Sequence, residues 1–377
     1  MIKKTSAEKP RARELGITFS GLVGANNAIT DVPGVEVGYV TKIAGQNIRT
    51  GVTAILPRGK AEIGMPCAAA FYSLNGNGEM TGTIWIEESG TLSMPIMITN
   101  THAVGRVHSG VVAWVAEHLP IVAAKWLLPV VAETWDGYLN EINLLAVTEE
   151  DAKAAIDNAK PGPVEEGSVG GGTGMNCYQY KGGNGTSSRI VKYAEKDYTV
   201  GAFVQANFGS RAELTITGVS MADSKIPNPL SDRTWLEVDN EMITPPQGAG
   251  SVIVIIATDA PLLPNQCKAL AKRVPLGLAR TGTAGSHFSG DIFLAFSTAN
   301  KGSFQSNFPS SNSNKSDYDI SRSIPWGEMD SFLTATVQAV EEAVVNALVV
   351  NQDMEGRDGH KSYAITREFI ESKFKKT

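Results

Sequence analysis

Apolar runs bounded by turn residues form the strongest pattern in this chain, and they predict strands. The clearest is segment 251–258 (SVIVIIAT), whose β-branched residues continue without a polar break and therefore predict a buried strand. Further apolar or alternating runs predict strands at 35–40, 51–57, 95–99, 127–131, 198–207 and 291–297.

Apolar residues at helical spacing predict helices at 104–118, 152–159, 264–280 and 330–350. Strands and helices are interspersed, but they do not alternate strictly. This order favours antiparallel sheets covered by helices over a parallel doubly wound sheet. The Gly-rich segment 169–188 satisfies neither common nucleotide-binding motif, so we expect turns and close backbone packing there.

Two polar segments interrupt this pattern. Residues 219–250 are irregular and end in TPPQGAG, which predicts a linker that leads directly into the strand at 251. Residues 303–316 are rich in Ser and Asn and predict a loop before the last long helix.

Composition and charge exclude several classes of protein. The 377 residues are 42% hydrophobic and 19% charged, which indicates a large core rather than a disordered chain. The 33 Lys and Arg against 39 Asp and Glu, with no basic run, argue against a nucleic-acid partner. No apolar run reaches the roughly 18–20 residues that span a bilayer, and the charged N-terminus lacks the apolar region of a signal peptide. Cys67, Cys177 and Cys267 show no metal-ligand spacing and predict free thiols in the cytoplasm.

Common catalytic signatures are absent from the sequence, and the five histidines are too scattered to predict a metal site. One serine offers another chemistry. If the chain were cleaved between Gly250 and Ser251, Ser251 would carry a free α-amino group with a pKa of about 7.7–8.0. Such an amine can act as general base for its own hydroxyl. The local pattern alone, however, favours the simpler interpretation that Ser251 only begins a strand.

Longer motifs change this balance, because together they span nearly the whole chain. They are NNAITDVPGVEVG (26–38), RTGVTAILPRG (49–59), SLNGNGEMTGTIWIEESG (73–90), PIMITNTHAVG (95–105), LPVVAETWDGYLN (128–140), GPVEEGSVGGGTGM (162–175), YTVGAFVQANFGSR (198–211), SVIVIIATDAPLLPNQ (251–266) and SGDIFLAFST (289–298). In these motifs the chain resembles the self-processing aminopeptidases, which comprise L-aminopeptidase/D-Ala-esterase-amidase and the β-peptidyl aminopeptidases. The similarity is strongest to the D-Ala-esterase/amidase branch.

The resemblance implies a single α/β domain, residues 1–377, built as a four-layer α/β/β/α sandwich. Such a sandwich resembles the N-terminal-nucleophile hydrolases but connects its strands differently. Self-cleavage at Gly250–Ser251 would give an α chain of residues 1–250 and a β chain of residues 251–377. Two such chains form a heterodimer, and the resemblance implies a homotetramer of heterodimers.

The matching motifs also imply roles for particular residues. Ser251 corresponds to the nucleophile. Ser289 and Asp291 correspond to its hydrogen-bonding relay. Asn207 corresponds to the oxyanion-hole amide, a neutral donor suited to a tetrahedral oxyanion. Glu133 corresponds to the carboxylate that binds the free ammonium of the substrate.

Two aromatic positions complete the expected pocket. Trp135 stands where the D-Ala-esterase/amidase branch has Tyr, so a hydroxyl is replaced by a larger apolar wall. Trp126 matches a second aromatic lining position. No metal or organic cofactor is implied.

These residues predict a serine aminopeptidase or amidase that acts on short peptides, amides or esters with a free N-terminal amine. Two alternatives are weaker. An acyltransferase of the ornithine-acetyltransferase type would use Thr as nucleophile, against which Ser251 argues. A non-catalytic binding protein on this scaffold would have no need to keep Ser251, Asn207, Ser289 and Asp291 together.

Overall fold

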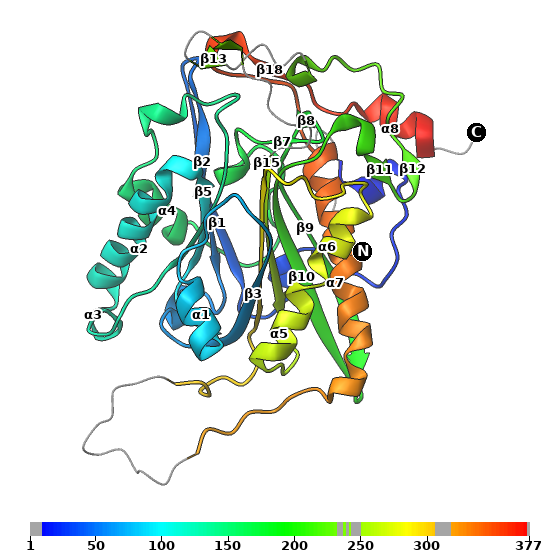
Figure 1. Ribbon diagram of the computed structural model, residues 1–377. Coiled ribbons are helices and arrows are strands. Elements are labelled where there is room, and N and C mark those ends of the chain that lie inside the picture. The colour runs from blue at the N-terminus through cyan, green and yellow to red at the C-terminus, as the bar shows by residue number, and fades with distance from the viewer. Residues whose placement is uncertain (1–9, 232–236, 239–240, 243–249, 306–317, 375–377) are drawn as a thin grey trace.

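Two β-sheets form the centre of the computed structural model, which describes residues 10–231, 237–238, 241–242, 250–305 and 318–374 (Figure 1). The smaller sheet has the order β1-β2-β5-β6, and the larger has the order β4-β3-β16-β15-β10-β9. The strands of the smaller sheet are β1 (Glu36–Ala44), β2 (Ile48–Leu56), β5 (Ile96–Asn100) and β6 (Val130–Thr134). Those of the larger are β3 (Cys67–Gly76), β4 (Thr91–Leu92), β9 (Gly183–Tyr193), β10 (Lys196–Asn207), β15 (Gly250–Thr258) and β16 (Ser289–Ser297).

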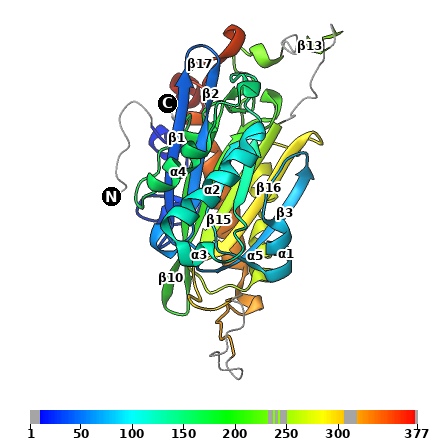
Figure 2. The same cartoon turned by 90° about the vertical axis from the view of Figure 1, so that its left-hand side faces the viewer.

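Helices cover the outer face of each sheet. Helices α2 (Val104–His118) and α4 (Glu149–Asp157) pack on the smaller sheet and lie in front of it in Figure 2. Helices α5 (Pro264–Ala271), α6 (Val274–Ala279) and α7 (Asp330–Val349) pack on the larger one. The predicted four-layer α/β/β/α sandwich is therefore confirmed.

Shorter elements connect these layers or lie at their ends. The helices are α1 (Thr83–Ser89), α3 (Pro120–Ala123) and α8 (Arg367–Phe374). The two-residue strands are β7 (Asn176–Cys177), β8 (Tyr180–Lys181), β11 (Thr215–Ile216), β12 (Val219–Ser220), β13 (Glu237–Val238), β14 (Glu241–Met242), β17 (Met354–Glu355) and β18 (Lys361–Ser362).

The position of strand β15 between two hydrophobic cores explains why its sequence is apolar throughout. Ile253 and Ile255 point into the core between the two sheets, whereas Val252 and Val254 point into the core between the larger sheet and its helices. Because successive side chains of a strand point to opposite faces, a strand with helices on one side and a sheet on the other needs apolar residues at every position. The uninterrupted run at 251–258 is thus a direct consequence of the layered architecture.

Helix α7 is long and apolar enough to cross a membrane by length and composition, but 78% of its most apolar stretch is buried. It packs along β9 and β10 as a core helix, as the predicted stripe requires.

The structure corrects several details of the sequence prediction. The sheets are mixed rather than antiparallel, because β5–β6 and β15–β16 are parallel pairs. Parallel neighbours need a crossover connection. Helices α2 and α3 connect β5 to β6, and helices α5 and α6 connect β15 to β16. The helix predicted at 264–280 is two helices, since Pro275 lies within the first two positions of α6 and cannot continue a helix from the preceding turn. Strand β6 begins three residues after the predicted start at 127.

The Gly-rich segment 169–188 contains the start of strand β9, which the sequence analysis missed. The predicted close packing is present there: a Cβ at Gly185 would lie 2.0 Å from the carbonyl oxygen of Ala343 in α7. Most of the predicted linker end at 244–250 and of the loop at 303–316 lies outside the described residues.

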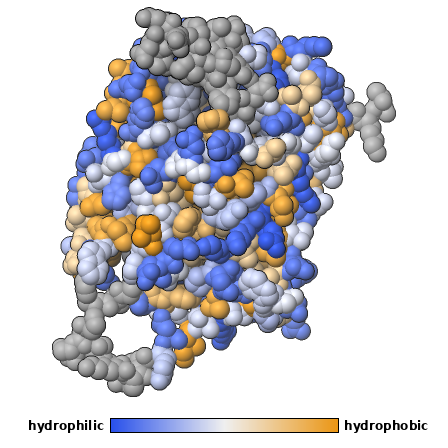
Figure 3. All heavy atoms as spheres, in the orientation of Figure 1, coloured by the Kyte–Doolittle hydropathy of each residue, from blue (hydrophilic) through white to orange (hydrophobic). Residues whose placement is uncertain are grey.

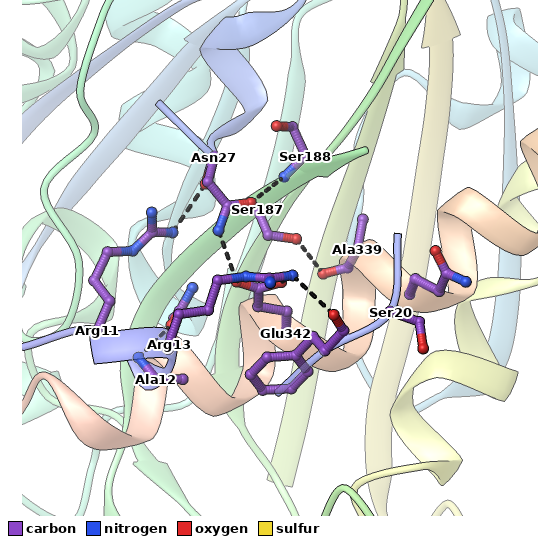
Figure 4. A network of polar contacts seen from close by, with 12 residues as sticks. Arg11, Ala12, Arg13, Ser20, Asn27, Ser187, Ser188, Ala339 and Glu342 are labelled. Carbon is purple, nitrogen blue, oxygen red and sulfur yellow. Dashed lines mark hydrogen bonds and ion pairs between the residues drawn. The ribbon is translucent and has the colours of Figure 1, made fainter. Parts of the chain in front are cut away.

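A buried ionic network fastens the N-terminal segment to this framework (Figure 4). Glu342 of α7 pairs with Arg189 of β9 at 2.7 Å and with Arg13 at 2.7 Å, and it accepts a hydrogen bond from Asn27 at 2.6 Å. The side chains of Arg189 and Glu342 are each only 1% exposed. Burial alone would raise the pKa of Glu342, but the hydrogen bond from Arg13 and the two guanidinium charges outweigh it and lower that pKa.

We expect Glu342→Gln to lower the free energy of unfolding by about 3 kcal/mol, because it leaves the buried guanidinium of Arg189 and the half-buried one of Arg13 without their charge partner. The matched control is Glu341→Gln, whose partner Arg280 is 49% exposed, so its loss should cost less than about 1 kcal/mol. Urea denaturation measures both. Since the pKa of Glu342 is lowered by folding, its contribution is complete above the ordinary Glu pKa of about 4.3 and is lost as the pH falls through the folded value. Equal losses in the two variants would contradict this assignment.

Candidate active site

Four predicted site residues lie at the same end of the larger sheet, because three strands begin or end there. In the register of the antiparallel pair β10–β15, Asn207 lies opposite Ser251. In the parallel pair β15–β16, Gly250 lies beside Ser289 and Val252 lies beside Asp291. The sheet thus brings Ser251, Asn207, Ser289 and Asp291 together although they come from segments far apart in the sequence.

The smaller sheet contributes the backbone of Trp135, which follows β6. The N–H of Trp135 donates to Oγ of Ser251 at 3.2 Å, and its carbonyl oxygen accepts from Nδ2 of Asn207 at 2.9 Å. Oδ1 of Asn207 accepts from the N–H of Asn176 at 2.9 Å. Ser251 and Asn207 are 2% and 6% exposed, so a hydroxyl and an amide are held at fixed positions between the two sheets.

Ser289 and Asp291 form a buried hydrogen-bonded pair next to Ser251. The Ser289 hydroxyl donates to Oδ1 of Asp291 at 2.5 Å, and Nδ2 of Asn75 donates to Oδ2 at 3.1 Å. Burial raises the pKa of Asp291, although the hydrogen bonds from Ser289, Asn75 and the Val252 backbone partly oppose that rise. In the β15–β16 register these two residues lie on either side of Gly290, which is beside Ser251, so the pair is close to the backbone of Ser251.

Glu133, near the end of β6, presents a carboxylate on the facing sheet. One oxygen accepts from the Thr101 hydroxyl, and the other accepts from the N–H of Glu79 at 3.1 Å. Glu133 is 3% exposed, and burial raises its pKa while the Thr101 and Glu79 hydrogen bonds oppose the rise. A Cβ at Gly78 would lie 3.0 Å from Oε1 of Glu133 and 3.1 Å from Cα of Gly290, the residue beside Ser251. The carboxylate is therefore close to this end of β16.

Glycine is required at two points of this site. A Cβ at Gly250 would lie 2.0 Å from the carbonyl oxygen of Asn207, and one at Gly290 would lie 2.4 Å from that of Asn77. Both contacts are far shorter than van der Waals distance, so only glycine lets the backbone of β15 and β16 come this close to its neighbours.

The two predicted aromatic residues lie in different places. Trp135 is 36% exposed and lies beside the site, with its ring against Gly137. Trp126 precedes the opposite end of β6 and lines an apolar cavity of about 340 Å³ together with Trp85 and Leu128. The structure therefore does not bring Trp126 to Ser251 within one chain. In Figure 3, apolar groups are interspersed with polar ones on the side formed by α2 and α3.

The structure adds residues that sequence reasoning did not assign. Asn75 and Thr101 lie inside motifs that carried the family resemblance, but no local pattern distinguished them as partners of Asp291 and Glu133. Asn176 and Lys181 lie in the Gly-rich segment that was interpreted as turns and close packing.

Comparison with known proteins places this geometry in a family. The sequence model of peptidase family S58 matches residues 27–362, so the chain belongs to that family. It is 48% identical over 368 residues to the β-peptidyl aminopeptidase BapA of Sphingosinicella microcystinivorans, covering 94% of this chain and 89% of that protein. BapA of Sphingosinicella xenopeptidilytica is 41% identical over 372 residues, with the same shares covered.

Solved structures agree with this assignment. The L-aminopeptidase D-Ala-esterase/amidase of Ochrobactrum anthropi, described as a prototype of the serine aminopeptidases and a variant of the Ntn-hydrolase fold, aligns with a TM-score of 0.86 and 42% identity over 96% of this chain and 97% of that one. A β-aminopeptidase of Burkholderia sp. aligns with a TM-score of 0.84 at the same identity and coverage. The protein is a serine aminopeptidase of the N-terminal-nucleophile type. These identities do not support the sequence-based preference for the D-Ala-esterase/amidase branch.

Proposed function

We propose that this aminopeptidase cleaves itself between Gly250 and Ser251 and then uses Ser251 as its N-terminal nucleophile. The observation that carries the proposal is the meeting of Ser251 with Asn207, Ser289 and Asp291 at one end of the larger sheet. In self-cleavage, Oγ of Ser251 attacks the carbonyl carbon of Gly250, the peptide C–N bond breaks, and water hydrolyses the resulting ester. The products are an α chain, residues 1–250, and a β chain, residues 251–377, of one α/β/β/α domain.

In the peptidase reaction, Oγ of Ser251 attacks the carbonyl carbon of the substrate and its proton passes to the α-amine of the same residue. Nδ2 of Asn207 carries two hydrogens, so the one not donated to Trp135 can stabilise the oxyanion. When the tetrahedral intermediate collapses, the leaving amine or alcohol takes up the proton, and water then hydrolyses the acyl-enzyme. Ser289 and Asp291 hold the proton network beside the α-amine.

Glu133 is the proposed site for the free ammonium of the substrate. Its carboxylate is buried on the facing sheet, and a Cβ at Gly78 would lie close both to this carboxylate and to Gly290, the residue beside Ser251. A charge-assisted hydrogen bond at that place selects substrates that carry an amine next to the scissile bond. Trp135 adds an apolar wall, so small or hydrophobic N-terminal residues are favoured over charged ones. The similarity to the BapA proteins supports β-amino as well as α-amino residues at that position.

The proposed assembly is a homotetramer of heterodimers in the cytoplasm. Large apolar side chains around α1 and α3 are exposed, which supports self-association through this surface. They are Ile84, Trp85, Ile121, Trp126 and Leu128. The three cysteines are buried and free, which fits a reducing compartment.

The test compares an alanine p-nitroanilide with its N-acetyl form. We expect the wild-type enzyme to prefer the free amine strongly, and Glu133→Gln to reduce that preference by about tenfold or more, as loss of one buried charge pair predicts. The matched control is Glu79→Gln, since Glu79 is an exposed carboxylate whose backbone already contacts Glu133. Equal cleavage of both substrates by the wild type would contradict the proposed requirement for a free amine. An unchanged ratio in Glu133→Gln would show that Glu133 is not the amine anchor.

A further inference from the structure

Lys181 is a buried lysine that the proposed reaction does not use. Its side chain is fully buried, and no ion pair joins it to a carboxylate among the residues that the structure describes. Nζ donates to the carbonyl oxygens of Met175 and Gly182, each at 2.8 Å. Burial of the ammonium lowers the pKa of Lys181 to about 7. Because a buried charge without a counterion is costly, its retention beside the candidate site needs a reason.

The Met175–Asn176 peptide group connects this lysine to the site. Its carbonyl oxygen accepts from the Lys181 ammonium, and its N–H donates to Oδ1 of Asn207 at 2.9 Å. An ammonium on the carbonyl oxygen polarises the peptide and strengthens the hydrogen bond that the N–H makes. Only one peptide group therefore separates Lys181 from the proposed oxyanion-hole amide.

The orientation of the Asn207 amide depends on that N–H. With Oδ1 on Asn176, Nδ2 points to the carbonyl oxygen of Trp135 at 2.9 Å. A flipped amide would set two donors against each other at Asn176 and two acceptors against each other at Trp135. The hydrogen bond from Asn176 thus keeps the donating side of Asn207 toward Ser251.

The hairpin that carries Lys181 has a strained turn. Strands β7 and β8 are joined by Tyr178 and Gln179, whose φ angles are +51° and +58°. Two-residue turns of this kind favour Asn and Gly, and neither residue is present here. The carbonyl oxygen of Met175, which directly precedes the hairpin, accepts from the N–H of Gly182 at 2.9 Å and from the Lys181 ammonium, so Lys181 reinforces a base that the backbone also closes.

We propose that Lys181 is a positioning residue of the oxyanion site, which holds and polarises the Asn207 amide through the Met175–Asn176 peptide. The inference rests on the proposed role of Asn207. It assigns a function to a residue that touches neither the nucleophile nor the substrate.

A double-mutant cycle on kcat tests this assignment, with kcat normalised to the processed enzyme measured by mass spectrometry. Lys181→Met removes the charge and keeps most of the volume. We expect it to lower kcat about tenfold with little change in KM, the size of one coupled polar interaction. Asn207→Ala should lower kcat by about 10²-fold or more, as for other oxyanion-hole donors. In the double variant, Lys181→Met should cause no further loss. The matched control is Lys192→Met, an exposed lysine of β9.

Each other outcome has a distinct meaning. If Asn207→Ala leaves kcat unchanged, the proposed role of Asn207 fails, and the role of Lys181 fails with it. If Asn207→Ala lowers kcat but Lys181→Met does not, or if the two losses multiply, only the inference about Lys181 is overturned. If a variant is not processed, the rate of self-cleavage is compared in the same cycle. Where Lys181→Met does not fold, Lys181→Gln takes its place; if neither folds, Lys181 serves the fold itself and the proposal is overturned.

Discussion

Replacing Ser251 with alanine should leave the protein as one chain of 40.0 kDa and reduce peptidase activity by roughly 10⁴-fold or more. The wild-type protein should instead yield two fragments, residues 1–250 and 251–377. The reason is that one hydroxyl is proposed to attack both the Gly250 carbonyl and the substrate. Intact-mass spectrometry of the purified proteins measures processing, and an amino-acid p-nitroanilide assay measures activity.

The matched control for this prediction is Ser372→Ala, an exposed serine of α8, which should be processed and active like the wild type. A wild-type chain that remains intact and is fully active would show that neither self-cleavage nor a free α-amine is needed. An active Ser251→Ala enzyme would remove Ser251 as the nucleophile.

Asp291→Asn should lower turnover by about 10²-fold or more in a folded, processed enzyme. The substitution keeps the size of the side chain but removes the negative charge that accepts the Ser289 hydroxyl proton at 2.5 Å. KM should change little, because Asp291 is not placed against the substrate amine. Asp259→Asn is the matched control, since Asp259 follows the other end of β15 and accepts a backbone N–H from Thr199 at 2.7 Å.

The pH profile gives a second check on Asp291. Burial raises the pKa of this carboxyl, so the charged form required by the relay is lost as the pH falls through that raised value. Wild-type turnover should therefore fall as the pH is lowered. The Asp291→Asn variant has no carboxyl group at this position, so its turnover should fall less over the same pH range. Unchanged turnover in Asp291→Asn would exclude the carboxylate from the mechanism.

Much of the secondary structure follows from local pattern. The helix predicted at 104–118 has those bounds in α2, and the strand predicted at 251–258 differs from β15 by one residue. Both segments have a clear apolar period that only one kind of element can bury. The prediction failed where glycine hides the period, as in β9, and where a proline divides one apolar run into α5 and α6.

The candidate site was predictable only through family motifs. Local pattern allowed Ser251 no more than a possible role, and it assigned no chemistry to Asn207 or Glu133. Their meeting depends on strand pairing: Asn207 reaches Ser251 through the β10–β15 register, and Trp135 reaches it from a different sheet. The placement of Trp126 shows the limit of motif matching. Trp126 and Trp135 both lie close to β6 in the sequence, but Trp126 precedes the strand and Trp135 follows it, so only Trp135 lies beside Ser251.

The sequence by itself therefore determined the segments with a clear apolar period, such as β15 and α2, and the faces that they bury, because side-chain periodicity and turn chemistry are local properties. It also marked Gly250 and Ser251 as an unusual junction between a polar segment and a buried strand. Only the tertiary structure decided that β15 and β16 are parallel, that Glu133 faces the site from the second sheet, and that the ammonium of Lys181 lies one peptide group from Asn207. These relations join residues through strand register and close packing, and no spacing along the chain encodes such contacts.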